Sequence, residues 1–159
     1  DRTGKTAGYF HSGLDLEATN GQSVLASASG TVKLVKNTSS STDTGKTLII
    51  EHSGGYYTQY QHLQDILVTE GAVVTQGQLV ALADDTGAST APHLHFNIQK
   101  TSVISTRASS TLNPLDFLPI SGRKADYVRG AVFAPSDLVN KTVECKNSAD
   151  SVGVGWVVL

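Results

Sequence analysis

The chain has 159 residues, of which 39% are hydrophobic and 16% charged, and its 12 basic and 14 acidic side chains give a formal net charge of -2. This length fits a single domain with one core. The apolar content excludes a disordered chain, and the balanced charge excludes a nucleic-acid partner held by a basic face. No apolar run approaches the ~20 residues that a membrane-spanning helix needs.

The chain contains one cysteine, Cys145, and no methionine. A single thiol excludes both an intrachain disulfide and a cysteine-based zinc site, so any metal site must be built from histidines and carboxylates. Because the chain starts at Asp1 and lacks methionine, we expect a processed or trimmed product, in which a signal peptide would not be visible.

Short apolar or alternating runs, separated by Gly, Asn and Asp, fill most of the chain from about residue 23 to residue 96. This pattern is typical of strands and turns. We predict strands at residues 23–28, 31–36, 47–52, 56–62, 78–83 and 93–99, with a tight hairpin turn at 53–55. No window of helix length has a 3.6-residue apolar period, so almost no long helix is expected and the fold class is mainly β.

Two stretches of small polar residues, 38–45 (TSSSTDTG) and 101–111, are predicted to be exposed loops. Residues 113–119 (NPLDFLP) are expected to close over an apolar surface. Residues 120–159 are shorter than most independent domains, and their Val-rich end at 152–159 is either one more strand or an ordered tail. The predicted organisation is therefore a main domain at 1–119 and an extension of unknown role at 120–159 that packs on it.

The histidines are few enough to be considered one by one: His11, His52, His62, His93 and His95. His93-Leu94-His95 lies inside a predicted strand, where alternate side chains share a face, so both imidazoles point to the same side and Leu94 points into the core. Two imidazoles placed in this way can put one nitrogen on a metal ion and leave the other beside it.

A second cluster, H-S-G-L-D at 11–15, places an imidazole and a carboxylate four residues apart around a flexible glycine. A turn here could bring both onto one ion. His11, Asp15 and one histidine of the H-x-H pair would then give three ligands and an open position, which is typical of catalytic zinc. Either motif alone occurs more often without a metal. By the same reasoning, His62 could be a surface histidine, and His52, at a strand end, is more typical of a hydrogen-bonded structural residue.

Taken together, five motifs resemble the lysostaphin- and LytM-type zinc endopeptidases, the β-lytic metallopeptidase family. They occur in the family's order and span about residues 10–118: HSGLD at 11–15, ASASGTV at 26–32, IEHSGGYYTQYQHL at 50–63, EGAVVTQGQ at 70–78 and TGASTAPHLHF at 86–96. The resemblance implies that His11, Asp15 and His95 are the ligands of one Zn2+ per chain. It implies that His62 and His93 are the catalytic histidines beside the metal-bound water.

The same resemblance implies an antiparallel β-sheet core whose face forms the floor of a substrate groove walled by loops. It implies hydrolysis of peptide crosslinks in bacterial peptidoglycan, often next to glycine, by a metalloendopeptidase. The partners expected are peptidoglycan peptides, with no nucleic acid and no membrane span, and the chain is expected to be a monomer that is secreted or held in the cell envelope, outside the cell or in the periplasm.

Two other interpretations compete with this one. The first is a catalytically silent peptidoglycan-binding or scaffold module with the same fold, against which the intact set of His11, Asp15 and His95 counts. The second rests on residues 70–78, which also resemble the hairpins of biotinyl and lipoyl carrier domains. Biotinyl carriers usually place a lysine between methionines, and this chain has no methionine.

Overall fold

The structure, a computed structural model, describes residues 11–107 and 109–117. These residues form nine strands, all paired antiparallel, and two short 3-10 turns; they contain no α-helix. The elements are β1 (Leu14–Glu17), β2 (Ser23–Leu25), β3 (Gly30–Lys36), β4 (Lys46–His52), η1 (Ser53–Gly55), β5 (Tyr56–Ile66), β6 (Val73–Val74), β7 (Leu79–Ala83), β8 (His93–Gln99), β9 (Thr111–Leu112) and η2 (Pro114–Asp116).

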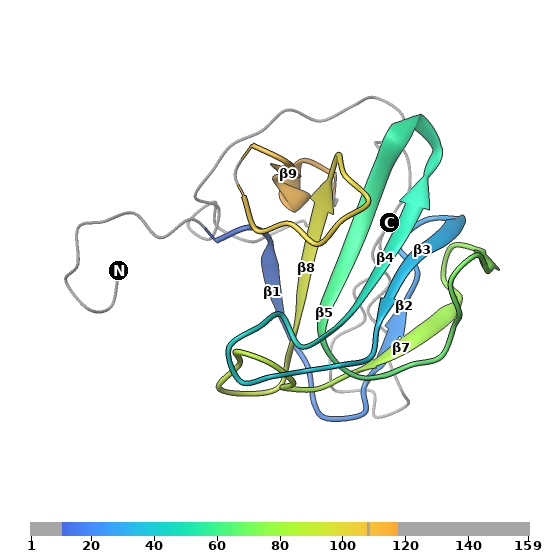
Figure 1. Ribbon diagram of the computed structural model, residues 1–159. Coiled ribbons are helices and arrows are strands. Elements are labelled where there is room, and N and C mark those ends of the chain that lie inside the picture. The colour runs from blue at the N-terminus through green and yellow to red at the C-terminus, as the bar shows by residue number, and fades with distance from the viewer. Residues whose placement is uncertain (1–10, 108, 118–159) are drawn as a thin grey trace.

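The strand order is β1-β8-β5-β4-β3-β6, and Figure 1 shows β1, β8, β5, β4 and β3 side by side. The long strand β5 is central: its first part pairs with β4 and β8, and its last residues pair with β7, which also pairs with β2. The sheet therefore brings β1, near the start of the chain, directly beside β8, about eighty residues later.

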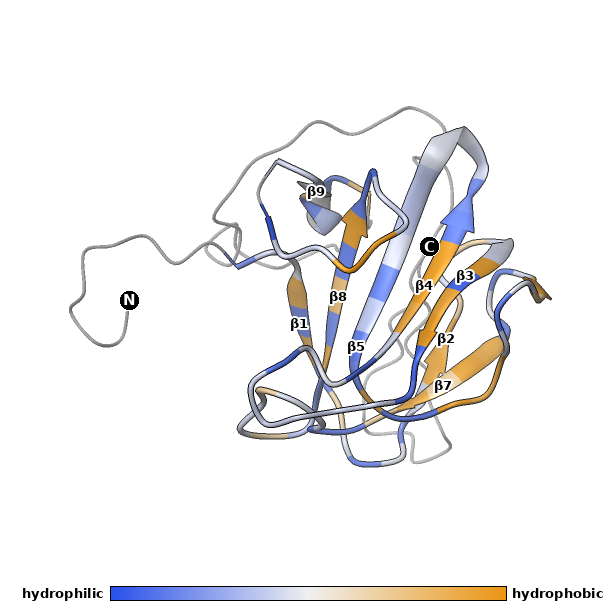
Figure 2. Ribbon diagram, in the orientation of Figure 1, coloured by the Kyte–Doolittle hydropathy of each residue, from blue (hydrophilic) through white to orange (hydrophobic). Residues whose placement is uncertain are grey.

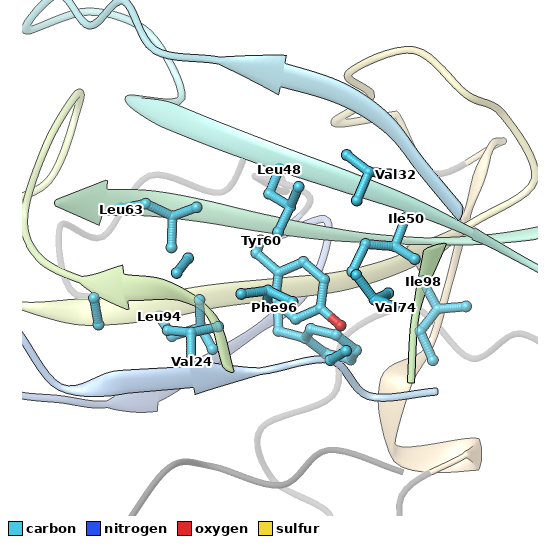
Figure 3. Close-up of a cluster of buried hydrophobic side chains, with 14 of the residues drawn as sticks. Val24, Val32, Leu48, Ile50, Tyr60, Leu63, Val74, Leu94, Phe96 and Ile98 are labelled. Carbon is cyan, nitrogen blue, oxygen red and sulfur yellow. The ribbon is translucent and has the colours of Figure 1, made fainter. Parts of the chain in front are cut away.

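The hydrophobic core lies on one face of this sheet, where Tyr60, Leu94 and Phe96 are fully buried. Figure 3 shows these side chains packed together with those of β2, β3, β4 and β6. The rings of Tyr60 and Phe96 lie 5.3 Å apart. Phe117, just after η2, joins this cluster and contacts the Tyr56 ring, as expected for a segment that closes over an apolar surface.

The opposite face of β5 and β8 carries polar side chains. Figure 2 shows β5 mostly white to blue, beside β4, whose middle part is orange. Gln59, Asn97 and Gln99 are fully buried on this face, because the loop 101–107 lies across them. The Gln59 amide donates to the Ser105 carbonyl and accepts from the Ser105 N–H. Hydrogen bonds from buried side-chain amides thus hold this loop against the face of the sheet.

The predicted strands agree with the structure in most places. The predicted strand 93–99 coincides with β8, and the predictions at 31–36, 47–52 and 78–83 differ from β3, β4 and β7 by one residue each. The hairpin turn at 53–55 joins β4 to β5 as predicted. The prediction at 56–62 was too short, since β5 continues to Ile66, and the prediction at 23–28 was too long, since β2 ends at Leu25 beside a register shift.

His52, at the end of β4, is buried. It makes two hydrogen bonds, neither of them to another histidine. Its Nδ1–H donates to the Ser29 carbonyl at 3.0 Å, and its Nε2 lies 2.7 Å from the Thr58 hydroxyl. Burial lowers its pKa below the ordinary value, although the bond to Ser29 partly opposes this shift. These contacts are those of a hydrogen-bonded structural residue.

A pH-dependent loss of stability follows from His52. Because its folded pKa lies below its unfolded value of about 6.5, the unfolded chain binds more protons as the pH falls through that value, and the free energy of unfolding decreases. We expect a His52→Gln variant to be less stable than the wild type by about 1–3 kcal/mol at pH 8. The difference between the two proteins should shrink as the pH falls below about 6.5. Urea unfolding at several pH values measures both effects, and a difference independent of pH would contradict the role of His52.

Within the described part of the chain, no helix has the length and apolar character needed to cross a membrane. The extension 120–159, its Val-rich end and Cys145 lie outside the described residues. The division of the chain at residue 119 therefore stays a prediction.

Candidate metal centre and active site

The pairing of β1 with β8 creates the centre of the site. Asp15 on β1 lies opposite His95 on β8, so their side chains share a face. The Asp15 Oδ1 atom lies 2.8 Å from His95 Nδ1 and 3.2 Å from His11 Nε2. Asp15 lies on a strand and not in the turn that the sequence suggested, and His11 reaches it from the segment that leads into that strand.

This group fits a zinc ion by the chemistry of its donors. It offers two imidazole nitrogens and one carboxylate oxygen, and the three atoms all lie within 4.8 Å of one another. Such a set leaves one position of a tetrahedral zinc site open. His11 and Asp15 face solvent with side-chain exposures of 43% and 49%, whereas His95 is only 7% exposed, so an ion could enter from one side and meet a fixed ligand on the other.

The protonation of the group also suits a cation. Burial alone would raise the pKa of Asp15, but hydrogen bonds from His11 and His95 outweigh it and hold the pKa well below the ordinary value. The carboxylate is therefore ionised at neutral pH. Burial lowers the pKa of His95, mainly through desolvation of its charged form, so this imidazole is neutral. Nδ1 would offer a lone pair to a metal in the tautomer that carries its hydrogen on Nε2, and not in the tautomer that donates to Asp15. The hydrogen bond to Asp15 raises the pKa of His11, which favours its protonated form, so a bound metal ion would have to displace that proton.

Ser12 supports His95 from behind. Its hydroxyl lies 3.3 Å from His95 Nε2, and the serine is buried. An imidazole that binds a metal through Nδ1 carries its hydrogen on Nε2, and the Ser12 oxygen can accept that hydrogen. Partners of this kind fix the orientation of metal-binding histidines. The sequence contained Ser12 within HSGLD, but its contact with a residue on β8 could not be inferred from the motif.

Gly13 allows β1 to approach β8 closely. A Cβ atom built at Gly13 would overlap the Phe96 carbonyl oxygen and would lie 2.9 Å from both His95 Nε2 and Asn97 Cβ. These are backbone and packed side-chain atoms of the central sheet, so they cannot easily move away. Only glycine therefore fits at position 13, where two chain segments are in close contact.

A Gly13→Ala variant should lose both stability and metal affinity. We expect a decrease of about 1–3 kcal/mol in the free energy of unfolding, because the methyl group forces β1 away from β8. Zinc affinity should fall as well, because Asp15 moves with β1. Gly71→Ala is the matched control: Gly71 has φ 82° and nothing within 4 Å of the added methyl. It should cost about 1–2 kcal/mol through backbone strain and leave zinc affinity unchanged. Equal zinc affinity in both variants, by calorimetry, would contradict this account.

The remaining two predicted site residues lie beside the metal-binding group. His93 Nε2 is 3.6 Å from Asp15 Oδ1, and the His62 ring lies 4.6 Å from the His93 ring and 6.1 Å from the His95 ring, measured between centroids. The structure therefore brings together all five residues singled out by sequence: His11, Asp15, His62, His93 and His95. Burial is the main reason that the pKa of His62 lies below the ordinary value. The His62 imidazole is therefore neutral at neutral pH.

A bulge in β5 turns His62 toward this group. Gln61 pairs with His95 and shares its face, so simple alternation would direct His62 into the core. Instead, His62 has φ 60°, and the register with β4 shifts by one residue between Tyr60 and Leu63. The extra residue allows Tyr60 and Leu63 both to point into the core, while Gln61 and His62 between them do not. Left-handed backbone at a residue other than glycine is uncommon and often marks a functional site. Sequence periodicity gave no signal for this bulge.

The fold and the geometry of the site define the class: a β-sheet protein in which two imidazoles and a carboxylate converge and two more imidazoles lie beside them. The chain belongs to Peptidase family M23, whose profile matches residues 9–111. It is 41% identical to peptidoglycan DD-endopeptidase ShyB of Vibrio cholerae over 88 residues, 55% of this chain and 20% of that protein. It is 33% identical to the murein hydrolase activator NlpD of Escherichia coli over 107 residues, 67% of this chain and 26% of that protein.

Solved structures show the same likeness. The catalytic domain of the antimicrobial peptidase lysostaphin from Staphylococcus simulans matches with a TM-score of 0.60 and 30% identity, covering 67% of this chain and 77% of that domain. The catalytic domain of the prophage-encoded M23 protein EnpA of Enterococcus faecalis, solved as a point mutant, matches with a TM-score of 0.61 and 27% identity, covering 76% of this chain and 85% of that one. The chain spans about a fifth of the length of the first relatives that it matches.

Proposed function

We propose that this chain is a zinc-dependent endopeptidase that hydrolyses peptide crosslinks of bacterial peptidoglycan. The observation that carries the proposal is the convergence of His11 Nε2, Asp15 Oδ1 and His95 Nδ1, with His62 and His93 beside them. The proposed ligands of one zinc ion are His11, Asp15 and His95. When bound there, zinc would supply the Lewis acidity that polarises a peptide carbonyl and lowers the pKa of a coordinated water.

The two neighbouring histidines would carry the proton transfers. His62 is kept neutral by burial, and a neutral imidazole can accept a proton from the attacking water. The same proton can then pass to the amine nitrogen that leaves when the peptide bond breaks. The second imidazole can donate a hydrogen bond to the carbonyl oxygen as negative charge develops on it. Either His62 or His93 could take either part, since their rings are adjacent.

The substrate class is supported by the names of the relatives. ShyB is named a peptidoglycan DD-endopeptidase and lysostaphin an antimicrobial peptidase. The family match, at residues 9–111, includes all five residues of the candidate site. We extend this substrate class to the present chain and propose that it acts outside the cell or in the envelope, where peptidoglycan lies. Glycine-containing crosslinks, and lysis of other bacteria, are the finer parts of the same proposal.

Mass spectrometry of digested cell walls tests the function. Zinc-loaded protein would be incubated with two purified peptidoglycans, one crosslinked through glycine bridges and one crosslinked directly between stem peptides. The proposal predicts soluble fragments with newly formed amino and carboxyl ends at peptide bonds in at least one of the two walls. Binding to both walls without any new ends would contradict the proposal and favour a silent binding module.

A further inference from the structure

One loop, residues 84–92, contacts both histidines that flank the proposed metal site. The Thr86 carbonyl oxygen lies 2.7 Å from His62 Nδ1, and the Ala91 carbonyl oxygen lies 2.9 Å from His93 Nδ1. The Ser89 hydroxyl donates to the same Ala91 oxygen at 2.9 Å and lies 3.2 Å from His93 Nδ1. The two histidines come from different strands, yet each is held through the same ring nitrogen by the same loop.

These contacts fix which ring nitrogen carries the hydrogen. A carbonyl oxygen can only accept, so the Nδ1 of each neutral imidazole must be the donor. The lone pair is then on Nε2 in both rings. His93 Nε2 faces the site, 3.6 Å from Asp15 Oδ1, and the His62 ring stacks at a tilt against the His93 ring. The loop therefore selects one tautomer for both histidines and leaves the proton-accepting lone pair of each ring on Nε2.

The loop itself is anchored on both sides. At its base, Asp84 accepts from the His93 N–H at 3.2 Å and donates its own N–H to the His62 carbonyl at 2.9 Å. In its middle, the Thr86 hydroxyl donates to the Leu63 carbonyl at 2.8 Å and accepts from the Lys46 N–H at 3.1 Å. The Thr86 side chain thus joins the loop to β4 and β5 at the bulge that turns His62.

A second loop, residues 38–45, backs the first. The Ala88 N–H donates to the Asp43 carbonyl at 2.7 Å, and Asp43 forms an ion pair with Lys36 at 2.8 Å. A Cβ atom at Gly45 would overlap the Thr86 carbonyl, and a Cβ atom at Gly87 would overlap the Gly45 nitrogen. The two loops are therefore in direct backbone contact, which leaves the Thr86 carbonyl little room to move away from His62.

We propose that loop 84–92 positions both flanking histidines, with the Thr86 and Ser89 hydroxyls as positioning residues that hold the two carbonyls in place. This inference rests on the proposed function for its catalytic consequence but not for its structural content. Neither hydroxyl touches the proposed metal ligands. Thr86 acts on His62 through its backbone carbonyl, and Ser89 acts on His93 through the Ala91 carbonyl and through its own contact with Nδ1. Loss of either hydroxyl should therefore change the rate of the chemical step more than the binding of substrate.

The tautomers of His62 and His93 test the structural content directly. Long-range proton–nitrogen NMR correlations distinguish a hydrogen on Nδ1 from one on Nε2. In the zinc-loaded wild type, both rings should carry their hydrogen on Nδ1 and their lone pair on Nε2. Finding the hydrogen on Nε2 in either ring would overturn the proposal, whether or not the protein hydrolyses peptidoglycan.

Thr86→Val tests the positioning role, because it keeps the shape of the side chain and removes both hydroxyl hydrogen bonds. We expect kcat to fall about 10–100-fold with KM within about twofold, as a small displacement of a catalytic group would cause. The His62 correlations should show a mixture of tautomers. Thr86→Ser keeps the hydroxyl and should restore kcat to within about threefold of the wild type. Thr69→Val is the matched control, an exposed threonine between β5 and β6 and outside both loops, and it should leave both readouts unchanged.

The outcomes separate this inference from the proposed function. The expected tautomers in a protein that releases no fragments from either wall would support the loop's role and contradict the proposed activity. A Thr86→Val protein that is folded by circular dichroism, with wild-type tautomers and wild-type kcat, would overturn the positioning role while leaving the activity established. Ser89→Ala gives the same comparison for His93.

Discussion

Substituting His95 by alanine should abolish zinc binding and, with it, peptidoglycan hydrolysis. His95 is the one buried member of the three-residue group, and Asp15 and Ser12 hold its two ring nitrogens. Loss of a partner outside the coordination sphere commonly weakens metal binding about 10–100-fold, so loss of a ligand should weaken it by more than about 100-fold. Zinc content by atomic emission, measured after dialysis, should fall from about one ion per chain to near zero.

His52→Gln is the matched control for that experiment. Like His95, His52 is a buried histidine on a strand, but it bonds to Ser29 and Thr58 and lies outside the group that could hold a metal. This variant should keep its full zinc content despite lower stability. If His95→Ala retained one zinc per chain, or if both variants lost zinc equally, the assignment of His95 as a ligand would be wrong.

Substituting His93 or His62 by alanine should give the opposite pattern, with zinc retained and hydrolysis lost. Both imidazoles lie beside the proposed ligands without being part of the three-residue group. A positioned acid or base contributes about 10²–10⁴-fold to a rate, so kcat should fall by that range in each variant. The loss of turbidity of a cell-wall suspension measures the rate, and metal analysis of the same samples measures zinc.

The double variant sharpens this prediction. Two residues that act in one proton-transfer sequence are not independent, so His62→Ala and His93→Ala together should cost much less than the product of the two single effects. A single variant with wild-type kcat would remove that histidine from the catalytic assignment. Loss of zinc in either single variant would instead make that residue a ligand.

Much of the sheet could be predicted from sequence because β3, β4, β7 and β8 contain clear apolar or alternating runs. The H-x-H pair was the most informative motif: in β8, Leu94 and Phe96 are fully buried, and both histidines lie on the other face, as alternation predicts. The two-residue strands β6 and β9 were missed because so short a segment cannot show a period. β1 was missed because its four residues, LDLE, overlap the glycine-containing motif HSGLD, which suggested a turn.

The site could be predicted as a set of residues but not as an arrangement. The five residues came from motifs and from the resemblance that those motifs carry, and the structure places them together. The left-handed backbone at His62, the Ser12 contact behind His95 and the two carbonyls of loop 84–92 depend on segments far apart in the chain. No local pattern specifies such contacts, because each is decided by how the sheet brings its strands together.

The central claim is that His11, Asp15 and His95 share one zinc ion, and a crystal structure of the zinc-loaded protein tests it most directly. Anomalous scattering at the zinc edge locates the ion without assumptions about its ligands. We expect one peak per chain, about 2.0–2.2 Å from His11 Nε2, from an Asp15 carboxylate oxygen and from His95 Nδ1. A peak bound by other residues, or Asp15 turned away from the ion while His11 and His95 bind it, would contradict the account.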